Sequence, residues 1–147
     1  MSLTAIPLYN AVTVGSTATP AAPYQATQIS PGVNNTIVGN AISFNFVMTN
    51  GANQAGSNAR IVFHWGFSMA SYTATNAATL GIISANQINL RFPKNPNATI
   101  DLTHQITYPI LGNYLYYWFD AFELTSPATL TVNAEVVALA NQCYSIT

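Results

Sequence analysis

Hydrophobic and polar residues alternate along several stretches of the chain with a period of two. The alternating segments are residues 42–49, 61–68, 87–92, 100–103 and 129–136. Because successive side chains of a β-strand point to opposite faces of a sheet, each segment predicts a strand with one face in a core. The segment 68–79 is rich in Ala and Thr and lacks this pattern, so it is expected to be a long loop with one helical turn at most.

Turn-forming residues separate the alternating segments, at Pro31-Gly32, Asn50-Gly51, Pro93 to Pro96, Gly112-Asn113 and Ser126-Pro127. Strands are expected near residues 10–16, 24–30, 34–49, 59–68, 79–84, 86–92, 98–108, 113–122 and 128–140. Eight or nine short strands at this spacing predict an all-β protein with a single β-sandwich of jelly-roll type.

The run Tyr114-Leu115-Tyr116-Tyr117-Trp118-Phe119 departs from simple alternation because it is apolar on both faces. We therefore expect a strand that is covered on both sides. In a sandwich the opposite sheet covers one side. A long loop, a bound ligand or another subunit would have to cover the other.

Residues 1–24 are expected to form an extended N-terminal arm, followed by a β-sandwich domain at 25–147. Pro7, Pro20, Pro23 and the small polar run 15–19 interrupt any long helix or central strand. A short edge strand is expected near Ala11 to Val14. The total length of 147 residues is typical of one domain.

Charge is scarce: only 5% of the residues are charged, with three Lys or Arg and four Asp or Glu. Average soluble domains carry about a quarter charged residues. Three basic residues cannot neutralise a run of phosphates, so neither direct nucleic-acid binding nor a polybasic membrane contact is expected. No apolar run is long enough to span a membrane, and no secretory leader is recognised at the N-terminus, so synthesis in the cytoplasm is expected.

Asn, Thr, Ser and Gln together make up about a third of the chain, and Ala is its most common residue. Such a surface is easier to desolvate than one of Lys and Glu, and near-zero net charge favours association. The composition therefore favours a protein that packs against copies of itself or a partner over an ordinary low-charge extracellular β domain.

No catalytic, cofactor or metal site is predicted, and the protein is not expected to be an enzyme. His64 and His104 could join a carboxylate, but a zinc site needs three or four ligands. Asp120 and Glu123 are more typical of solvated carboxylates, or of partners for Arg60 or Arg91, than of an acid–base pair.

The remaining chemical candidates also favour ordinary structural roles. The stretch 66–70 resembles a nucleophile elbow superficially but lacks the last glycine, so a strand end is expected. Calcium could bind around Asp101 or Asp120, although no calcium-loop motif is present. Cys143 is expected to be a simple thiol, and the Asn-x-Thr patterns at Asn34 and Asn97 are expected by chance in this composition.

Aromatic residues are the remaining candidates for a binding surface. Most aromatics in a strand belong to the core, but some can stack on sugar rings or lie in a subunit interface. The possible interface or ligand aromatics are Tyr114, Tyr116, Tyr117, Trp118 and Tyr72.

In general character the chain resembles bacteriophage virion proteins, in particular small head-decoration (cement) proteins of the jelly-roll or β-sandwich type. The features that carry this resemblance are the uncharged Asn/Thr/Ala-rich chain, the expected arm at 1–24, the alternating strands and the lack of a catalytic constellation. The resemblance implies a homotrimer or larger assembly seated on a lattice of another capsid protein.

Single jelly-roll capsid proteins are a near variant, and those that package RNA often carry a basic arm. Residues 1–24 contain no Lys or Arg, which favours an outer position.

Two functions are therefore expected from different classes. The first is a virion structural protein that stabilises a shell through subunit contacts, with the arm pairing to a neighbour's sheet edge. The alternative is a carbohydrate- or receptor-binding β-sandwich, such as a lectin or a phage-fibre head, which would present the aromatics in a groove.

Overall fold

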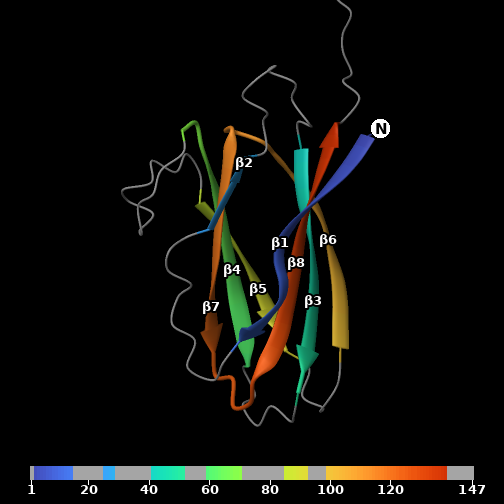
Figure 1. Ribbon diagram of the computed structural model, residues 1–147, viewed down its shortest axis with the longest axis vertical. Coiled ribbons are helices and arrows are strands. Elements are labelled where there is room, and N and C mark those ends of the chain that lie inside the picture. The colour runs from blue at the N-terminus through green and yellow to red at the C-terminus, as the bar shows by residue number, and fades with distance from the viewer. Residues whose placement is uncertain are drawn as a thin grey trace, which may run out of the picture.

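The structure, a computed structural model, describes residues 2–14, 25–28, 41–51, 59–70, 85–92 and 99–138. These residues form strands and connecting turns and contain no helix, so none of them crosses a membrane as a helix (Figure 1). The strands are β1 (Ser2–Val14), β2 (Gln25–Gln28), β3 (Ala41–Asn50), β4 (Arg60–Ser68), β5 (Ala85–Arg91), β6 (Thr99–Pro109), β7 (Tyr114–Phe122) and β8 (Ala128–Ala138).

The strands form two four-stranded sheets, one in the order β1-β8-β3-β6 and the other in the order β2-β7-β4-β5. Every described pairing is antiparallel. Apart from the pair β4 and β5, strands that are neighbours in a sheet are not consecutive among the described strands, as β1 and β8 show, so the fold depends on long-range pairing. The all-β prediction is therefore confirmed over the described residues.

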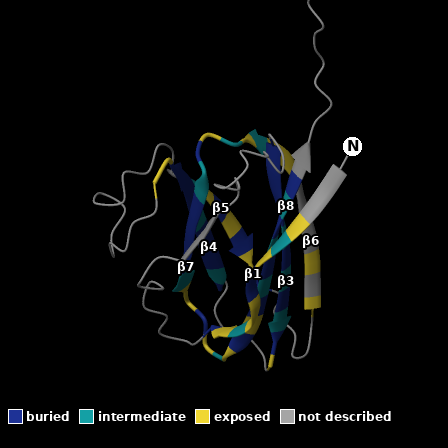
Figure 2. Ribbon diagram, turned by 45° about the horizontal axis from the view of Figure 1, so that its top comes forward, coloured by how far each residue is buried: buried dark blue, intermediate teal, exposed yellow. Residues whose placement is uncertain are grey.

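The alternating residues of the sequence lie on opposite faces of each sheet. On β3 the side chains of Ile42, Phe44, Phe46 and Met48 are at most 1% exposed, while Asn45, Val47 and Thr49 between them are half-buried. Figure 2 shows the buried residues concentrated in the centre of both sheets. The hydrophobic periodicity of 42–49 therefore identified the inner face correctly.

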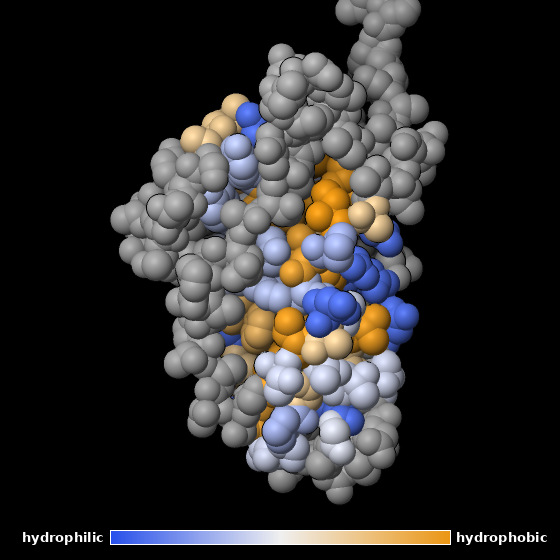
Figure 3. All heavy atoms as spheres, viewed as in Figure 1, coloured by the Kyte–Doolittle hydropathy of each residue, from blue (hydrophilic) through white to orange (hydrophobic). Residues whose placement is uncertain are grey.

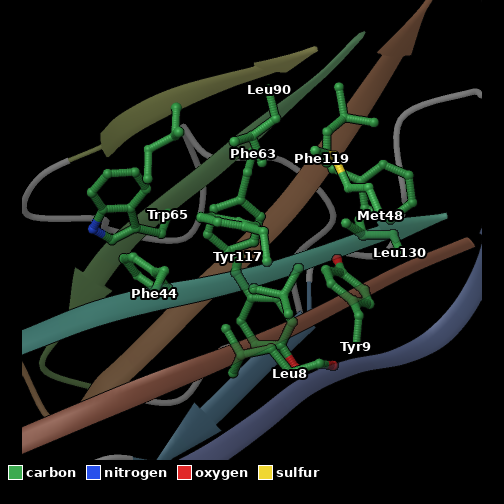
Figure 4. Packing of buried hydrophobic residues seen from close by; sticks show 14 of the residues in the cluster. Leu8, Tyr9, Phe44, Met48, Phe63, Trp65, Leu90, Tyr117, Phe119 and Leu130 are labelled. Atoms are coloured by element: carbon green, nitrogen blue, oxygen red, sulfur yellow. The ribbon is translucent and has the colours of Figure 1, made fainter. Parts of the chain in front are cut away.

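The inner faces of the two sheets pack against each other through aromatic rings (Figure 4). Phe44 of β3 lies 4.9 Å from Trp65 of β4, and Phe46 lies 5.3 Å from Phe63, measured between ring centroids. Burying rings of this size contributes roughly 1.5–3 kcal/mol each before the entropy of ordering is subtracted. One contiguous core results, with buried residues from β1, β3, β4, β5, β7 and β8, and Tyr108 of β6 packs against it.

The observed strand bounds follow the expected segments closely at 60–68, 85–91, 99–109 and 114–122, and at 128–138 as far as that strand is described. The strand expected at 34–49 is observed at 41–50, and residues 34–40 lie outside the described part. The strand expected near 79–84, and the loop expected at 68–79 beyond Ala70, lie outside the described residues. The total number of strands is therefore still a prediction.

The N-terminal segment differs from the expected arm where it is described. Residues 2–14 pair along β8 of the same chain, and Leu8, Tyr9 and Val14 are buried in the core. Residues 15–24 lie outside the described part, so the boundary at 24 stays a prediction. The described part of the N-terminal segment is therefore an edge strand of the sandwich that contributes to its core.

Irregular pairing accounts for the unexpected length of β1. The register of β1 against β8 shifts on both sides of Tyr9, and Ala11 adopts a positive φ of 45°. The Ala11 amide donates to the hydroxyl oxygen of Thr131 at 3.0 Å, so a side chain replaces a missing ladder bond. Bulges of this kind let an edge strand contain Pro7 and a left-handed residue and still deliver its apolar side chains to the core.

Candidate functional site

The outer face of the β2-β7-β4-β5 sheet carries the described basic residues and a histidine–carboxylate pair. His64 of β4 is opposite Trp118 of β7, and Val62 is opposite Asp120. Successive side chains of a strand point to opposite faces of the sheet. Phe63 of β4 and Phe119 of β7 point into the core, so His64, Trp118 and Asp120 point outward. Antiparallel pairing therefore places these three residues next to one another.

His64 contacts both of its neighbours on this face. Its Nε2 lies 3.0 Å from Oδ2 of Asp120, and its ring is stacked on Trp118 with centroids 5.1 Å apart and planes 6° apart. The two polar side chains are 21% and 26% exposed. The second carboxylate oxygen, Oδ1, is buried and has no partner among the described residues.

A histidine–carboxylate pair can orient an imidazole for proton transfer when a third group brings a substrate atom to its other nitrogen. Within the described residues, no group of three or more His, Cys, Asp or Glu side chains lies close enough together to hold a metal ion. The flat contact with Trp118 instead makes His64 part of the cover of the aromatic strand. The arrangement fixes the imidazole but offers no described nucleophile.

A row of cationic and aromatic residues lies at one end of the same face. Arg60 of β4 is directly opposite Arg91 of β5 on one side and Phe122 of β7 on the other. The Arg60 guanidinium carbon lies 4.6 Å from the centre of the Phe122 ring. Phe122 is 39% exposed and Arg91 is exposed. We call Arg60, Arg91 and Phe122 the basic row.

The predicted aromatic candidates separate into two groups. Tyr117 belongs to the core and is 6% exposed, whereas Tyr116 and Trp118 point to the outer face yet are only 1% and 8% exposed in the single chain. Tyr114 is half-buried, and Tyr72 lies outside the described residues. The prediction that this strand is covered on both sides is confirmed, and neither a ligand nor a second subunit is needed to bury it.

Two phenols of the core have different environments. Tyr117 donates a hydrogen bond from its hydroxyl to the Leu8 carbonyl oxygen at 3.3 Å, and its ring meets Tyr9 edge-on at 5.2 Å. The Tyr9 hydroxyl is buried without a partner among the described residues. Burial raises the pKa of both phenols above the ordinary value, most strongly for Tyr9, where the neighbouring Tyr117 adds to the effect.

The two histidines belong to different sheets. His104 pairs with Phe44 across the β3–β6 edge, immediately before a register shift between the Ile42 and Phe44 pairs. The prediction of a strand edge or bulge at His104 is confirmed. His64 faces outward from the other sheet, so the fold does not place the two histidines at one site.

Other candidates occupy the ordinary positions expected for them. β4 ends at Ser68, whose hydroxyl bonds to the amide and carbonyl of Ala70, as expected for a strand end. Glu123 is exposed after β7, and its φ is 54°. Asp101 is exposed and accepts a bond from Asn45 at 3.2 Å. Three candidates, Cys143, Asn34 and Asn97, lie outside the described residues.

Sequence reasoning considered His64 with a carboxylate but did not pair it with Asp120, and it missed the basic row. Both sets depend on the register of β4 against its neighbours, since a shift of one residue would turn each side chain to the opposite face. The alternation around His64 indicated an outward position, which was the available signal.

Comparison with protein-family models, curated protein sequences and solved structures gives no match.

Proposed function

We propose that this protein is a structural subunit of a virion, of jelly-roll architecture, that stabilises a capsid shell through contacts between subunits. It would act as a decoration (cement) protein or as a capsid subunit, as a homotrimer or larger assembly together with another capsid protein. The observation that carries the proposal is the strand order, β1-β8-β3-β6 in one sheet and β2-β7-β4-β5 in the other.

This strand order is consistent with a jelly roll, in which two Greek keys place eight antiparallel strands in two four-stranded sheets. Viral capsid and lectin domains both use that architecture, so topology alone does not choose between them. The sparse charge and the uncharged polar composition favour subunit packing, because such surfaces are easily desolvated.

Burial of the aromatic candidates favours the structural function over carbohydrate binding. A sugar platform needs ring faces that are open to solvent, and Tyr116, Tyr117 and Trp118 are buried in the single chain. Large apolar residues do remain exposed among the described residues, namely Met69, Ile106, Leu111 and Phe122. Single exposed side chains of this kind are common on monomeric proteins, so they do not decide between the two functions.

The test is the molar mass in solution, measured by light scattering behind a sizing column over about a hundredfold range of protein concentration. The proposal predicts a trimer or a larger assembly whose population rises with concentration. A protein that stays monomeric throughout would contradict it. Tryptophan fluorescence in the presence of a panel of glycans is the matched control, and a saturable response would favour the carbohydrate-binding function.

A further inference from the structure

Each sheet is bounded by two edge strands, and most of these strands are irregular, short or interrupted. The edges are β1 and β6 in one sheet and β2 and β5 in the other (Figure 1). β1 contains Pro7 and two register shifts, and β2 has only four residues. β6 contains Asp101, a register shift and a terminal Pro109. Proline, charge, bulges and short length are the features by which natural sheets avoid adding another strand.

The side of the molecule at β1 and β8 shows what an irregular edge presents to other molecules. Over the described surface in Figure 3, a central column of hydrophobic residues is flanked by hydrophilic ones. Because the register of β1 shifts on both sides of Tyr9, a contact on that side would be made by side chains and not by a regular row of backbone groups.

β5 differs from the other three edge strands because it is regular over its whole length. Its seven residues contain no proline and pair with β4 in one uninterrupted register. Its single charged residue, Arg91, stands at its C-terminal end. Within the described residues β5 pairs only with β4. We call the side of β5 away from β4 the open edge.

The hydrogen bonds between β4 and β5 determine which backbone groups point to the open edge. The Phe92 amide donates to the Ala59 carbonyl oxygen at 2.8 Å. Hydrogen-bonded and non-hydrogen-bonded pairs alternate along an antiparallel ladder, so Leu90 and Ile88 also direct their backbone groups to β4. The amides and carbonyls that point to the open edge are therefore those of residues 85, 87, 89 and 91.

The side chains of β5 complement a second strand of the same pattern. Gln87, Asn89 and Arg91 are exposed on the outer face, whereas Ile88 and Leu90 between them are 7% and 3% exposed and face the core. A strand added at the open edge continues both faces only if it also has polar side chains outside and apolar ones inside. A second copy of β5 meets this requirement.

We propose that the β5 strands of two copies of this protein pair antiparallel at their open edges, about a two-fold axis at Ile88, so that two sheets become one continuous sheet. The inference goes beyond the proposed function and does not rest on it. A two-fold contact joins two copies only, so a trimer or larger assembly needs a further contact elsewhere on the molecule.

The backbone selects this register. With the axis at Ile88, Gln87 lies opposite Asn89 of the second copy, and Ala85 lies opposite Arg91. All the residues whose backbone groups point to the open edge then pair with one another. Each hydrogen-bonded pair exchanges two bonds, so about eight bonds join the two copies. Moving the axis to Gln87 or Asn89 would leave part of this row without a partner strand.

Charge favours the same register. The two Arg91 side chains stand at opposite ends of the paired strands, roughly 20 Å apart along them. This separation is about two Debye lengths at physiological salt, so their repulsion is screened. An axis at Leu90 would place Arg91 opposite Asn89 and bring the two arginines to about 7 Å along the strand. On the outer face the amides of Gln87 and Asn89 can donate to and accept from each other across the axis.

The first test places a proline at the open edge. The Asn89 amide points away from β4, so Asn89→Pro removes no hydrogen bond to β4, and proline is tolerated on an edge strand at such a position. It should raise the dissociation constant of self-association by about a hundredfold or more in light scattering, because a central bond is lost in both copies and the rings separate the strands.

Asn89→Ala is the matched control, since it removes the same side chain and keeps the amide. It should raise the dissociation constant by less than about fivefold, which is the range of one cross-strand side-chain pair. Circular dichroism should show the β-sheet spectrum of the wild type for both variants. An equal effect of both variants would mean that the side chain, and not the backbone edge, makes the contact, and would overturn the proposal.

A crosslink tests the register without a proline variant. Gln87→Cys and Asn89→Cys are made as separate proteins, each with Cys143→Ser to remove the single native cysteine. Mixed under mild oxidation, they should form a disulfide-linked dimer, because Cα atoms of a hydrogen-bonded pair lie about 5.5 Å apart, within disulfide range. Each protein alone should crosslink far less. Asn89→Cys linking best to itself would place the axis at Asn89 and overturn the register.

The outcomes for this contact and for the proposed function can be told apart. Self-association that is unchanged in Asn89→Pro, together with cysteine variants that link no better mixed than alone, would overturn the β5 contact, and a trimer found in that case would leave the proposed function in place. A wild-type protein that stops at a β5-linked dimer would support the contact and contradict the proposed function. A wild type that stays monomeric would contradict both.

Discussion

On their inner faces the two sheets are built alike, whereas on their outer faces they differ. Phe44 and Phe46 of β3 meet Phe63 and Trp65 of β4 across the core, and all four are fully buried. Outside, one sheet carries carboxylates among Thr and Asn, and the other carries arginines, a stacked His64 and aromatics. The inner faces therefore account for folding, whereas the two outer faces offer chemically different surfaces to other molecules.

The largest effect should come from opening the inner face. Phe44→Ala removes a ring that is 0% exposed and should lower the free energy of unfolding by about 3–5 kcal/mol, because a cavity remains in a packed core. Phe122→Ala, on the outer face, should cost less than about 1 kcal/mol. Urea denaturation compares the two variants, and equal losses in the free energy of unfolding would show that Phe122 belongs to the folding core.

The second largest difference in stability is expected between alanine substitutions at the two turn glycines. A Cβ on Gly112 would lie 2.6 Å from the Ser68 carbonyl oxygen, whereas a Cβ on Gly51 would meet its nearest atom, the Pro127 oxygen, at 3.4 Å. Gly112→Ala should therefore cost about 1–3 kcal/mol, because backbone at the end of β4 must move. Gly51→Ala should change thermal stability little. A silent Gly112→Ala would mean that the close approach is not required.

The histidine–carboxylate pair on the outer face should have a smaller effect. Asp120→Ala removes the partner 3.0 Å from His64 and should cost about 1 kcal/mol by chemical denaturation, since a partly buried polar group loses its hydrogen bond. Glu123→Ala is the control and should stay within about 0.5 kcal/mol of the wild type. If both variants behave alike, the pair contributes nothing to folding.

Phenylalanine substitutions at the two core tyrosines should differ by a smaller amount in the free energy of unfolding. Tyr117→Phe removes the bond to the Leu8 carbonyl and should cost about 0.5–1.5 kcal/mol. Tyr9→Phe removes a buried hydroxyl that has no partner among the described residues, so it should be neutral or slightly stabilising. The opposite order in a denaturation experiment would contradict these hydroxyl environments.

The same two phenols should make the free energy of unfolding depend on pH in the alkaline range. The pKa of Tyr9 and of Tyr117 in the folded protein lies above the ordinary value of 10.0. The neutral phenols are therefore favoured by folding, and their contribution is complete below that pH and decreases as the pH rises above it. Tyr9→Phe should flatten the alkaline decrease in the free energy of unfolding. An unchanged pH profile would show that Tyr9 does not contribute to the decrease.

Much of this architecture could be predicted because burial imposes a period on a strand. Residues 129–136 alternate strictly and residues 42–49 alternate except at Val47, and the structure places the alternating apolar positions inside. Prediction was weaker at the N-terminus, where Pro7, Pro20 and Pro23 suggested an arm. The bulges that allow Ser2–Val14 to pair with β8 depend on Thr131, which is distant in sequence.

The sequence by itself determined the all-β class, the strand end at Asn50-Gly51, the bend at Gly112-Asn113, and the double cover of the run 114–119, because these follow from local periodicity and turn chemistry. Only the tertiary structure decided which strands are neighbours and in what register. Those long-range pairings bring His64 to Asp120 and Trp118, set Arg60 between Arg91 and Phe122, and leave the acids Asp101 and Glu135 on the opposite face. The physical reason is that alternation specifies which way a side chain points but carries no information about which distant strand lies beside it.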